Sequence, residues 1–298
     1  MSMLSFVEVA HARTTEYMDA SDISRKWLDV PYGPGPRHRL DIYLPEEGEG
    51  PFPAVIQITG GGWVYGDKSM KKMGEMIHTV ISRGYALVSI NYTLSDDAKY
   101  PAQILECKAA VRFIRQNAAQ YRIDPEHIFL YGNSAGGYLS LMTAFTREGD
   151  WIYDVPREDQ QGISSRVTAV ADIYGVTHFE HAQQELAVFG LDGKYERDTL
   201  RSCEGYFFGY DLRENHEEVA RASVFNYVRP GVPPVLVQHG THDRTVCVKQ
   251  SYDLVHLLNI AGVYNEHDWF DGLDHSDPYF KSEKNTNRVL DFFDRFLK

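Results

Sequence analysis

The stretch His127-Ile128-Phe129-Leu130-Tyr131-Gly132-Asn133-Ser134-Ala135-Gly136-Gly137 decides the fold of this sequence. It begins with an apolar run of strand-forming residues, and a helix-like run at 139–145 follows it. Residues 132–136 fit G-x-S-x-G, which between a strand and a helix predicts a sharp turn with an exposed serine. Glycine has no β-carbon and permits such a turn, so we expect Ser134 at its tip, at the helix N-terminus. The alternative is an ordinary serine in a glycine-rich turn.

Strand-like and helix-like runs alternate on both sides of this stretch. We expect strands at 25–33, 37–45, 54–59, 85–92, 128–131, 167–174, 235–237 and 264–270, and helices at 69–83, 104–120, from 139, from 248 to about 262, and at 285–297. This alternation predicts an α/β fold with a mostly parallel central sheet and helices on both faces. The Pro/Gly-rich turn at 32–36 predicts antiparallel N-terminal strands, and Asp124-Pro125-Glu126 predicts a turn before the central strand.

The chain is expected to form a single domain, 1–298, with a cap insertion at about 176–221. The regular spacing of elements stops between Tyr174 and Pro233, a gap too long for one crossover connection. The segment is rich in charged and aromatic residues, among them Phe179, Phe189, Tyr195, Tyr206, Phe207, Phe208 and Tyr210. We interpret it as a cap over the site; the alternative is a surface excursion that packs only on itself.

Composition argues against several classes of partner. The net charge of −12 would repel nucleic acid and anionic membranes. We find no secretory signal and no run of about 18 apolar residues, and therefore expect no membrane partner and a cytoplasmic location. Three widely spaced cysteines, Cys107, Cys203 and Cys247, favour a reducing compartment without a disulfide framework. A homodimer is left open.

A serine hydroxyl becomes a good nucleophile only with a base in hydrogen-bond reach and a carboxylate that orients the base. Asp243 lies in a loop just after the strand expected at 235–237, where an orienting acid belongs. The alternatives for Asp243 are an N-cap of the helix that begins near Val248 and a plain surface acid.

The base is expected after the last strand, and His275 lies in a loop beyond Phe270. It follows Asp243 by 32 residues, which leaves room for a helix, a strand and a loop. The other histidines near Asp243 are His239 and His242, which lie too close to it in sequence for the expected geometry. With twelve histidines in the chain, a chance histidine at this place is the alternative.

Backbone N–H groups that hold a developing oxyanion are expected from two loops. Ala135, directly after the serine, supplies one, and Gly61 and Gly62 in the loop after the strand at 54–59 supply the others. Trp63, which ends this loop, is a candidate for substrate binding. Taken alone, the three glycines of the loop could be only a flexible turn.

Metal and cofactor motifs are absent from the sequence. There is no His-Glu-x-x-His, no cysteine pair at ligand spacing, no phosphate-binding loop and no G-x-G-x-x-G. We therefore expect no metal and no cofactor, and interpret the run Asp268, Asp271, Asp274 and Asp277 as a solvated loop.

Several short motifs occur together in a fixed order. They are 41–45 (DIYLP), 60–63 (GGGW) with 66–68 (GDK), 91–95 (NYTLS), 100–102 (YPA), 132–137, His239-Gly240 with Asp243, and His275. In this order they resemble the α/β-hydrolase superfamily, in its branch of His-Gly-Gly-Gly-type carboxylesterases that includes hormone-sensitive-lipase-like and acetyl or feruloyl esterases. The resemblance covers about residues 37–276. It departs at Thr59, where that branch usually has a histidine that braces the loop.

The resemblance implies a serine carboxylic ester hydrolase with Ser134 as nucleophile, His275 as base and Asp243 as orienting acid. Gly61, Gly62 and Ala135 would hold the oxyanion. The implied substrate is a small-molecule ester with a short acyl group, such as acetyl, or an aromatic one of the feruloyl type. The alternatives are an arylformamidase-like amide hydrolase, whose glycine-rich loop likewise ends in tryptophan, and a non-catalytic binding scaffold on the same fold.

Overall fold

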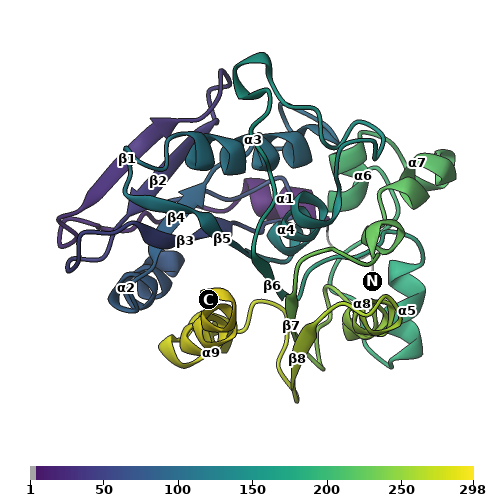
Figure 1. Cartoon of the computed structure of the whole chain (residues 1–298). Coiled ribbons are helices and arrows are strands. Elements are labelled where there is room, and N and C mark those ends of the chain that lie inside the picture. The colour runs from purple at the N-terminus through teal and green to yellow at the C-terminus, as the bar shows by residue number, and fades with distance from the viewer. Residues whose placement is uncertain (1–4) are drawn as a thin grey trace.

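One eight-stranded sheet forms the centre of the computed structural model, which describes residues 5–298 (Figure 1). The strands are β1 Lys26–Pro31, β2 Arg39–Tyr43, β3 Phe52–Ile58, β4 Ala86–Ile90, β5 Ile123–Asn133, β6 Ala169–Ile173, β7 Val235–Gly240 and β8 Asn265–Phe270. Their spatial order is β1-β2-β4-β3-β5-β6-β7-β8. The pairs β1–β2 and β2–β4 are antiparallel, and all the others are parallel. The predicted fold class is therefore confirmed.

Helices cover both faces of the sheet. They are α1 Phe6–His11, α2 Gly74–Ser82, α3 Ala102–Gln116, α4 Ala135–Phe145, α5 Ala182–Val188, α6 Cys203–Phe208, α7 His216–Arg221, α8 Val248–Ile260 and α9 Glu283–Phe293. In Figure 1, α3 and α4 lie above the sheet, and α2 and α9 lie below it. Within residues 5–298, no helix combines the length and the apolar character that crossing a bilayer would require.

The apolar strands are buried on both faces because each face has its own core. Ile56 and Leu130 belong to the core that α3 and α4 cover, whereas their chain neighbours Val55 and Phe129 belong to the opposite core. Phe129 stacks there on Phe293 of α9, with ring centroids 4.6 Å apart. Side chains alternate between the faces of a strand, so a strand covered twice must be apolar at consecutive positions.

Two local predictions differ from the structure. The turn expected at 124–126 lies inside β5, where the pairing with β3 shifts from Phe52–Ile123 to Ala54–Ile128. Asp124 Oδ1 accepts the Glu126 N–H at 2.9 Å, so a turn does form, as an irregularity within the strand. The helix expected from residue 69 begins only at Gly74, after the short 3-10 helix η1 Lys71–Met73.

The segment 176–221, between β6 and β7, contains α5, α6 and α7. It packs on the glycine-rich loop after β3, since Phe207 of α6 stacks on Trp63 with ring centroids 4.3 Å apart. That this segment is a cap insertion remains our proposal.

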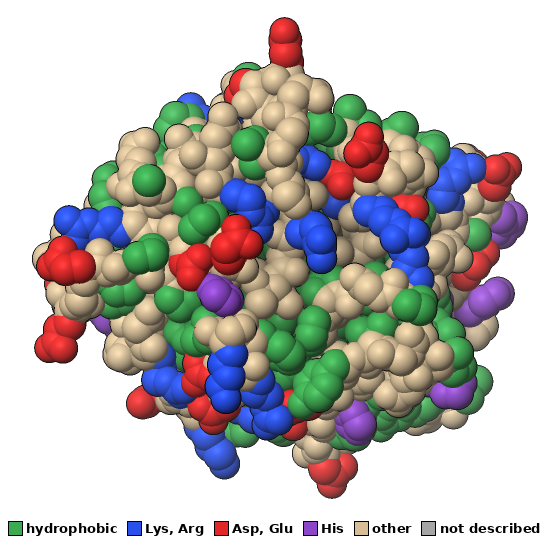
Figure 2. Space-filling model, in the orientation of Figure 1, with side chains coloured by type: hydrophobic (Ala, Val, Ile, Leu, Met, Phe, Trp, Pro, Cys, Tyr) green, Lys and Arg blue, Asp and Glu red, His purple; other side chains and the backbone are tan. Residues whose placement is uncertain are grey.

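Acidic, basic and hydrophobic side chains are interspersed over the face of the molecule that Figure 2 shows, so on that face the net negative charge is not gathered into one patch.

Candidate active site

Ser134 lies between the end of β5 and the start of α4, in a conformation that few residues other than glycine adopt. Its backbone angles are φ 54° and ψ −124°, a combination that costs of order 1–3 kcal/mol. The neighbouring glycines make the turn feasible. A β-carbon on Gly136 would lie 2.1 Å from the Ile58 carbonyl oxygen, and one on Gly132 would lie 2.1 Å from the Gly136 carbonyl oxygen. The turn therefore holds the serine in a strained position at the head of α4.

Three side chains from different parts of the chain meet at this turn. His275 Nε2 lies 2.9 Å from Ser134 Oγ, and His275 Nδ1 lies 2.7 Å from Asp243 Oδ2. An ionised carboxylate can only accept hydrogen bonds, so Nδ1 carries the proton and Nε2 is left to accept one from the serine. The residues predicted as nucleophile, base and acid thus form one continuous hydrogen-bonded chain.

Asp243 is fully buried, and four donors of the protein hold its carboxylate. Its Oδ1 accepts the backbone N–H groups of Thr245 and Val246, both at 2.8 Å, and its Oδ2 lies 3.1 Å from His239 Nε2 and near His275. Burial alone would raise the pKa of Asp243, but the two histidines outweigh it and lower this pKa below its usual value. Asp243 therefore stays ionised at neutral pH.

His239, too close in sequence to be the base, lies on the far side of the acid. Its Nε2 faces two acceptors, Asp243 Oδ2 and the Val246 carbonyl oxygen at 3.0 Å, and must carry a proton. Its Nδ1 lies 2.6 Å from Ser251 Oγ. His239 thus fixes the carboxylate that orients His275, a role that sequence reasoning missed because motif spacing does not show it.

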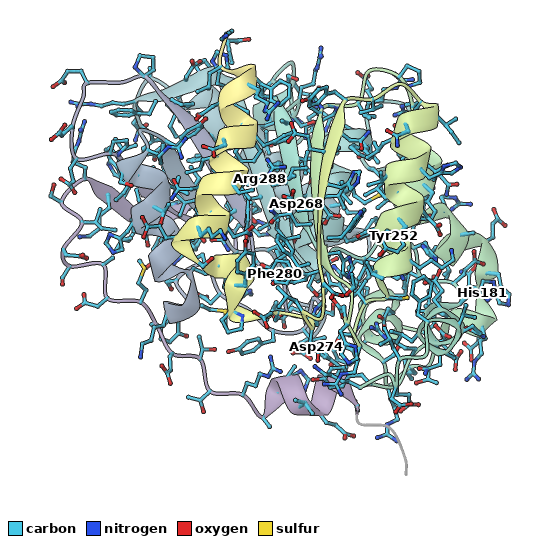
Figure 3. The ribbon with its side chains drawn as sticks, turned by 90° about the horizontal axis from the view of Figure 1, so that it is seen from below. His181, Tyr252, Asp268, Asp274, Phe280 and Arg288 are labelled. Atoms are coloured by element: carbon cyan, nitrogen blue, oxygen red, sulfur yellow. The ribbon has the colours of Figure 1, made fainter. Side chains whose placement is uncertain are left out.

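Asp274 ties the loop of the base to two other segments. Its Oδ1 accepts the backbone N–H of His275 at 2.7 Å, and its Oδ2 lies 2.8 Å from Arg244 Nη2 and 2.7 Å from Lys194 Nζ. Partial burial opposes ionisation, but these cationic partners lower the pKa of Asp274 below its ordinary value. Figure 3 shows Asp274 beyond the end of β8, away from Asp268 and Arg288, which face each other between β8 and α9. Asp274 therefore tethers the loop through ion pairs, whereas the sequence predicts a solvated loop residue at this position.

The glycine-rich loop is held by the Tyr92 hydroxyl and by its own backbone hydrogen bonds, and not by the side chain of Thr59. The Tyr92 hydroxyl donates to the Thr59 carbonyl oxygen at 2.9 Å, and the Gly61 carbonyl oxygen accepts the N–H groups of Val64 and Tyr65. The Thr59 hydroxyl instead accepts a bond from Gln57 at 3.3 Å. The bracing expected of a histidine is thus supplied from a neighbouring strand end.

A pocket of about 330 Å³, including its open mouth, lies directly against Ser134. It is lined by Phe6, Gly62, Trp63, Ser134, Ala135, Val176, Tyr195, Arg197, Cys203, Glu204, Thr245 and Val246. Of the predicted site residues, Gly62, Ala135 and Trp63 therefore share the pocket with Ser134, whereas Gly61, in the same loop as Gly62, is not among the lining residues. Sequence reasoning did not single out Phe6, Arg197 or Glu204, which belong to segments without a recognisable motif.

A second carboxyl, that of Asp172 on β6, is buried beneath the serine turn. Within residues 5–298 no side chain pairs with either of its oxygens, and a β-carbon on Gly137 would lie 2.4 Å from Oδ1. Burial raises the pKa of Asp172 to about 7, although the charge of His239 acts to lower it. The carboxyl is therefore largely protonated in the fold below neutral pH.

Replacing Asp172 with asparagine should flatten the pH dependence of stability. The folded pKa of Asp172 exceeds the ordinary value of 3.8, so its contribution to the free energy of unfolding falls as pH rises from about 4 to 7. Asparagine cannot ionise, and we expect Asp172→Asn to be more stable than the wild type at pH 8 by roughly 1–3 kcal/mol. Urea unfolding at pH 5 and pH 8 measures this, with exposed Asp271→Asn as control. A variant that is less stable at pH 8 would contradict it.

In the part of the chain that the structure describes, no three His, Cys, Asp or Glu residues are placed so that they could bind a metal ion together.

The family model described as BD-FAE matches residues 40–258, nearly three quarters of the sequence. The chain belongs to the BD-FAE family.

Curated relatives of this BD-FAE chain are named esterases. It is 31% identical to esterase LipQ of Mycobacterium tuberculosis over 242 aligned residues, and this alignment covers 78% of this chain and 53% of LipQ. It is 25% identical to a probable isoprenylcysteine alpha-carbonyl methylesterase, ICMEL1, of Arabidopsis thaliana, over 85% of this chain and 51% of that protein. The chain thus spans about half the length of the curated relatives it matches.

Solved structures match the BD-FAE chain over nearly its whole length. A truncated carbohydrate esterase from gut microbiota superposes with a TM-score of 0.82 and 29% identity, covering 94% of this chain and 99% of that one. A bifunctional GH43-CE protein of Bacteroides eggerthii superposes with a TM-score of 0.79 and 28% identity, over 93% of this chain and 38% of that one. These matches confirm the resemblance to α/β-hydrolase esterases.

Proposed function

We propose that this protein is a serine hydrolase that cleaves carboxylic esters through an acyl-enzyme intermediate. The observation that carries the proposal is the hydrogen-bonded chain from Ser134 Oγ through His275 to Asp243, with distances of 2.9 Å and 2.7 Å. Such a chain activates an alcohol that is otherwise a poor nucleophile at neutral pH. The names of the curated relatives support the same activity.

The proposed reaction has two halves. In the first, His275 Nε2 takes the proton of Ser134 as Oγ bonds to the ester carbonyl carbon, and then gives that proton to the leaving alcohol. In the second, water repeats the cycle on the acyl-serine and releases the acid. Asp243, ionised and anchored by Thr245 and Val246, stabilises the imidazolium that forms in each half.

The oxyanion of the tetrahedral intermediate is proposed to be held by N–H groups of Gly61, Gly62 and Ala135. Ala135 is the first residue of α4, an 11-residue helix whose N-terminus carries no side-chain cap, so its free N–H groups and dipole favour negative charge. Gly62, at φ 60°, and Ala135 both line the pocket beside the serine.

The substrate is proposed to carry a short acyl group or an aromatic one, because the pocket is small and mostly apolar. For 4-nitrophenyl esters from acetate to laurate, we expect kcat/KM to be highest at acetate or propionate and roughly 100-fold lower at laurate. Methyl ferulate tests the aromatic alternative in the same assay. A preference for laurate would contradict the proposal.

The two alternatives from the sequence are decided alongside this assay. An arylformamidase-like enzyme would turn over N-formylkynurenine faster than aryl acetates, and a non-catalytic scaffold would turn over neither and would not react with a fluorophosphonate probe. The cytoplasmic location and the homodimer stay predictions.

A further inference from the structure

A buried ion pair lines the pocket beside Ser134. Arg197, from the segment before α6, and Glu204, in the first turn of α6, have side chains that are 5% and 3% exposed. The Arg197 guanidinium pairs with Glu204 Oε1. Both residues share the pocket lining with Ser134, Trp63 and Ala135.

Half of the Glu204 carboxylate is left without a partner. Its Oε2 is buried, and no hydrogen-bond donor reaches it from residues 5–298. A buried carboxylate oxygen without a donor is costly, because the water that it lost is not replaced. Nor does a buried ion pair normally stabilise a fold more than apolar residues of the same volume. Stability therefore does not explain why this pair lies in the pocket.

The chemistry of the pair defines what would complete it. The Glu204 carboxylate would repel an anionic group, and the Arg197 guanidinium would repel a cationic one. An apolar group would leave Oε2 without a hydrogen-bond donor. A neutral hydroxyl fits both partners, because it can donate to Oε2 and accept from the guanidinium. Phe6 and Tyr195, which line the same pocket, are aromatic and pack edge to face with ring centroids 5.0 Å apart.

We infer that Arg197 and Glu204 form a specificity-determining subsite that binds a neutral hydroxyl group of the ester substrate. The inference rests on the proposed ester hydrolysis at Ser134. The hydroxyl belongs either to the alcohol part, as in a sugar-like polyol, or to the acyl part, as in a hydroxycinnamoyl group. In both cases the subsite selects esters that carry a hydroxyl over otherwise equal esters that lack it.

Matched ester pairs test this selection and separate the two sources. Cyclohexyl acetate is compared with the monoacetate of trans-1,2-cyclohexanediol for the alcohol side, and methyl cinnamate with methyl 4-hydroxycinnamate for the acyl side. In one of the two pairs we expect kcat/KM of the wild type to favour the hydroxylated ester about 10- to 100-fold. A preference below about twofold in both pairs would overturn the inference.

The variants then assign the preference to the ion pair. Glu204→Gln keeps the side-chain shape and removes the charge, and should reduce the preference. The double variant Arg197→Met/Glu204→Leu removes both charges together, leaves no unpaired ion, and should abolish the preference. The control is Arg229→Met/Asp150→Leu, which removes an ion pair outside the pocket lining and should keep it. A preference that survives in the double variant, or one that Glu204→Gln leaves intact if the double variant fails to fold, sinks the inference.

A binding measurement separates failure of the inference from failure of the proposed function. Titration of trans-1,2-cyclohexanediol monoacetate and of methyl 4-hydroxycinnamate into Ser134→Ala protein needs no turnover. We expect Kd for the preferred ester to rise at least about tenfold when Glu204→Gln or the double substitution is added. Unchanged Kd values overturn the subsite even in an active esterase. Weakened binding together with no turnover of any ester by the wild type would instead overturn the hydrolysis and leave a hydroxyl-binding site.

Discussion

Replacing Ser134 with alanine is expected to lower kcat for 4-nitrophenyl acetate about 10⁵- to 10⁶-fold. The substitution removes Oγ, the atom that lies 2.9 Å from His275 Nε2 and that would bond to the substrate carbon. Alanine keeps the β-carbon and hence the strained φ of 54°, so the free energy of unfolding should change little. Steady-state turnover, the acylation burst and labelling by a fluorophosphonate probe measure the loss.

A buried serine on α4, the helix that follows Ser134, provides the matched control. Ser140, one helical turn after Gly136, donates to the Gly136 carbonyl oxygen at 2.8 Å and does not line the pocket. Ser140→Ala should keep kcat within a few-fold of the wild type and should still be labelled by the probe. Turnover by Ser134→Ala above about one hundredth of the wild-type rate would show that another group attacks the ester.

Replacing Asp243 with asparagine is expected to lower kcat about 10³- to 10⁴-fold. Oδ1 accepts the N–H groups of Thr245 and Val246, so the asparagine oxygen should take this position and its NH₂ group should face His275. His275 Nδ1 would then have to accept a hydrogen bond, and the proton would move to Nε2, which could no longer take the serine proton. The positions of the three side chains are then kept, but His275 has the wrong tautomer to act as a base.

The same substitution has a stability signature at acid pH. The folded pKa of Asp243 lies below the ordinary value of 3.8, so the unfolded chain binds more protons as pH falls below about 4 and the wild type loses stability there. Asp243→Asn should lack this contribution to the acid loss. Exposed Asp271→Asn, in the loop before His275, is the control and should retain both the activity and the acid slope. An Asp243→Asn enzyme that kept more than a tenth of kcat would argue that another residue orients the base.

Local backbone sterics explain why the core of the candidate site could be predicted from the sequence. The turn at Ser134 needs glycines at 132 and 136, where a β-carbon would lie 2.1 Å from a carbonyl oxygen, and this need is visible as G-x-S-x-G. Chain order then restricts where acid and base follow, at the ends of β7 and β8. Prediction was weaker where pairing partners decide the outcome: the turn at 124–126 lies inside β5 because of its irregular register with β3.

The sequence by itself determined the parallel sheet, the serine turn and the chain order of the three candidate residues Ser134, Asp243 and His275, because periodicity and glycine placement act through neighbours in the chain. Only the tertiary structure decided what surrounds them. His239 against Asp243, Tyr92 on the Thr59 carbonyl oxygen, and the Arg197–Glu204 pair beside Ser134 join segments or atoms that no spacing rule connects. The physical reason is that a buried polar group takes its partner from whatever packing brings near, and packing depends on the whole chain at once.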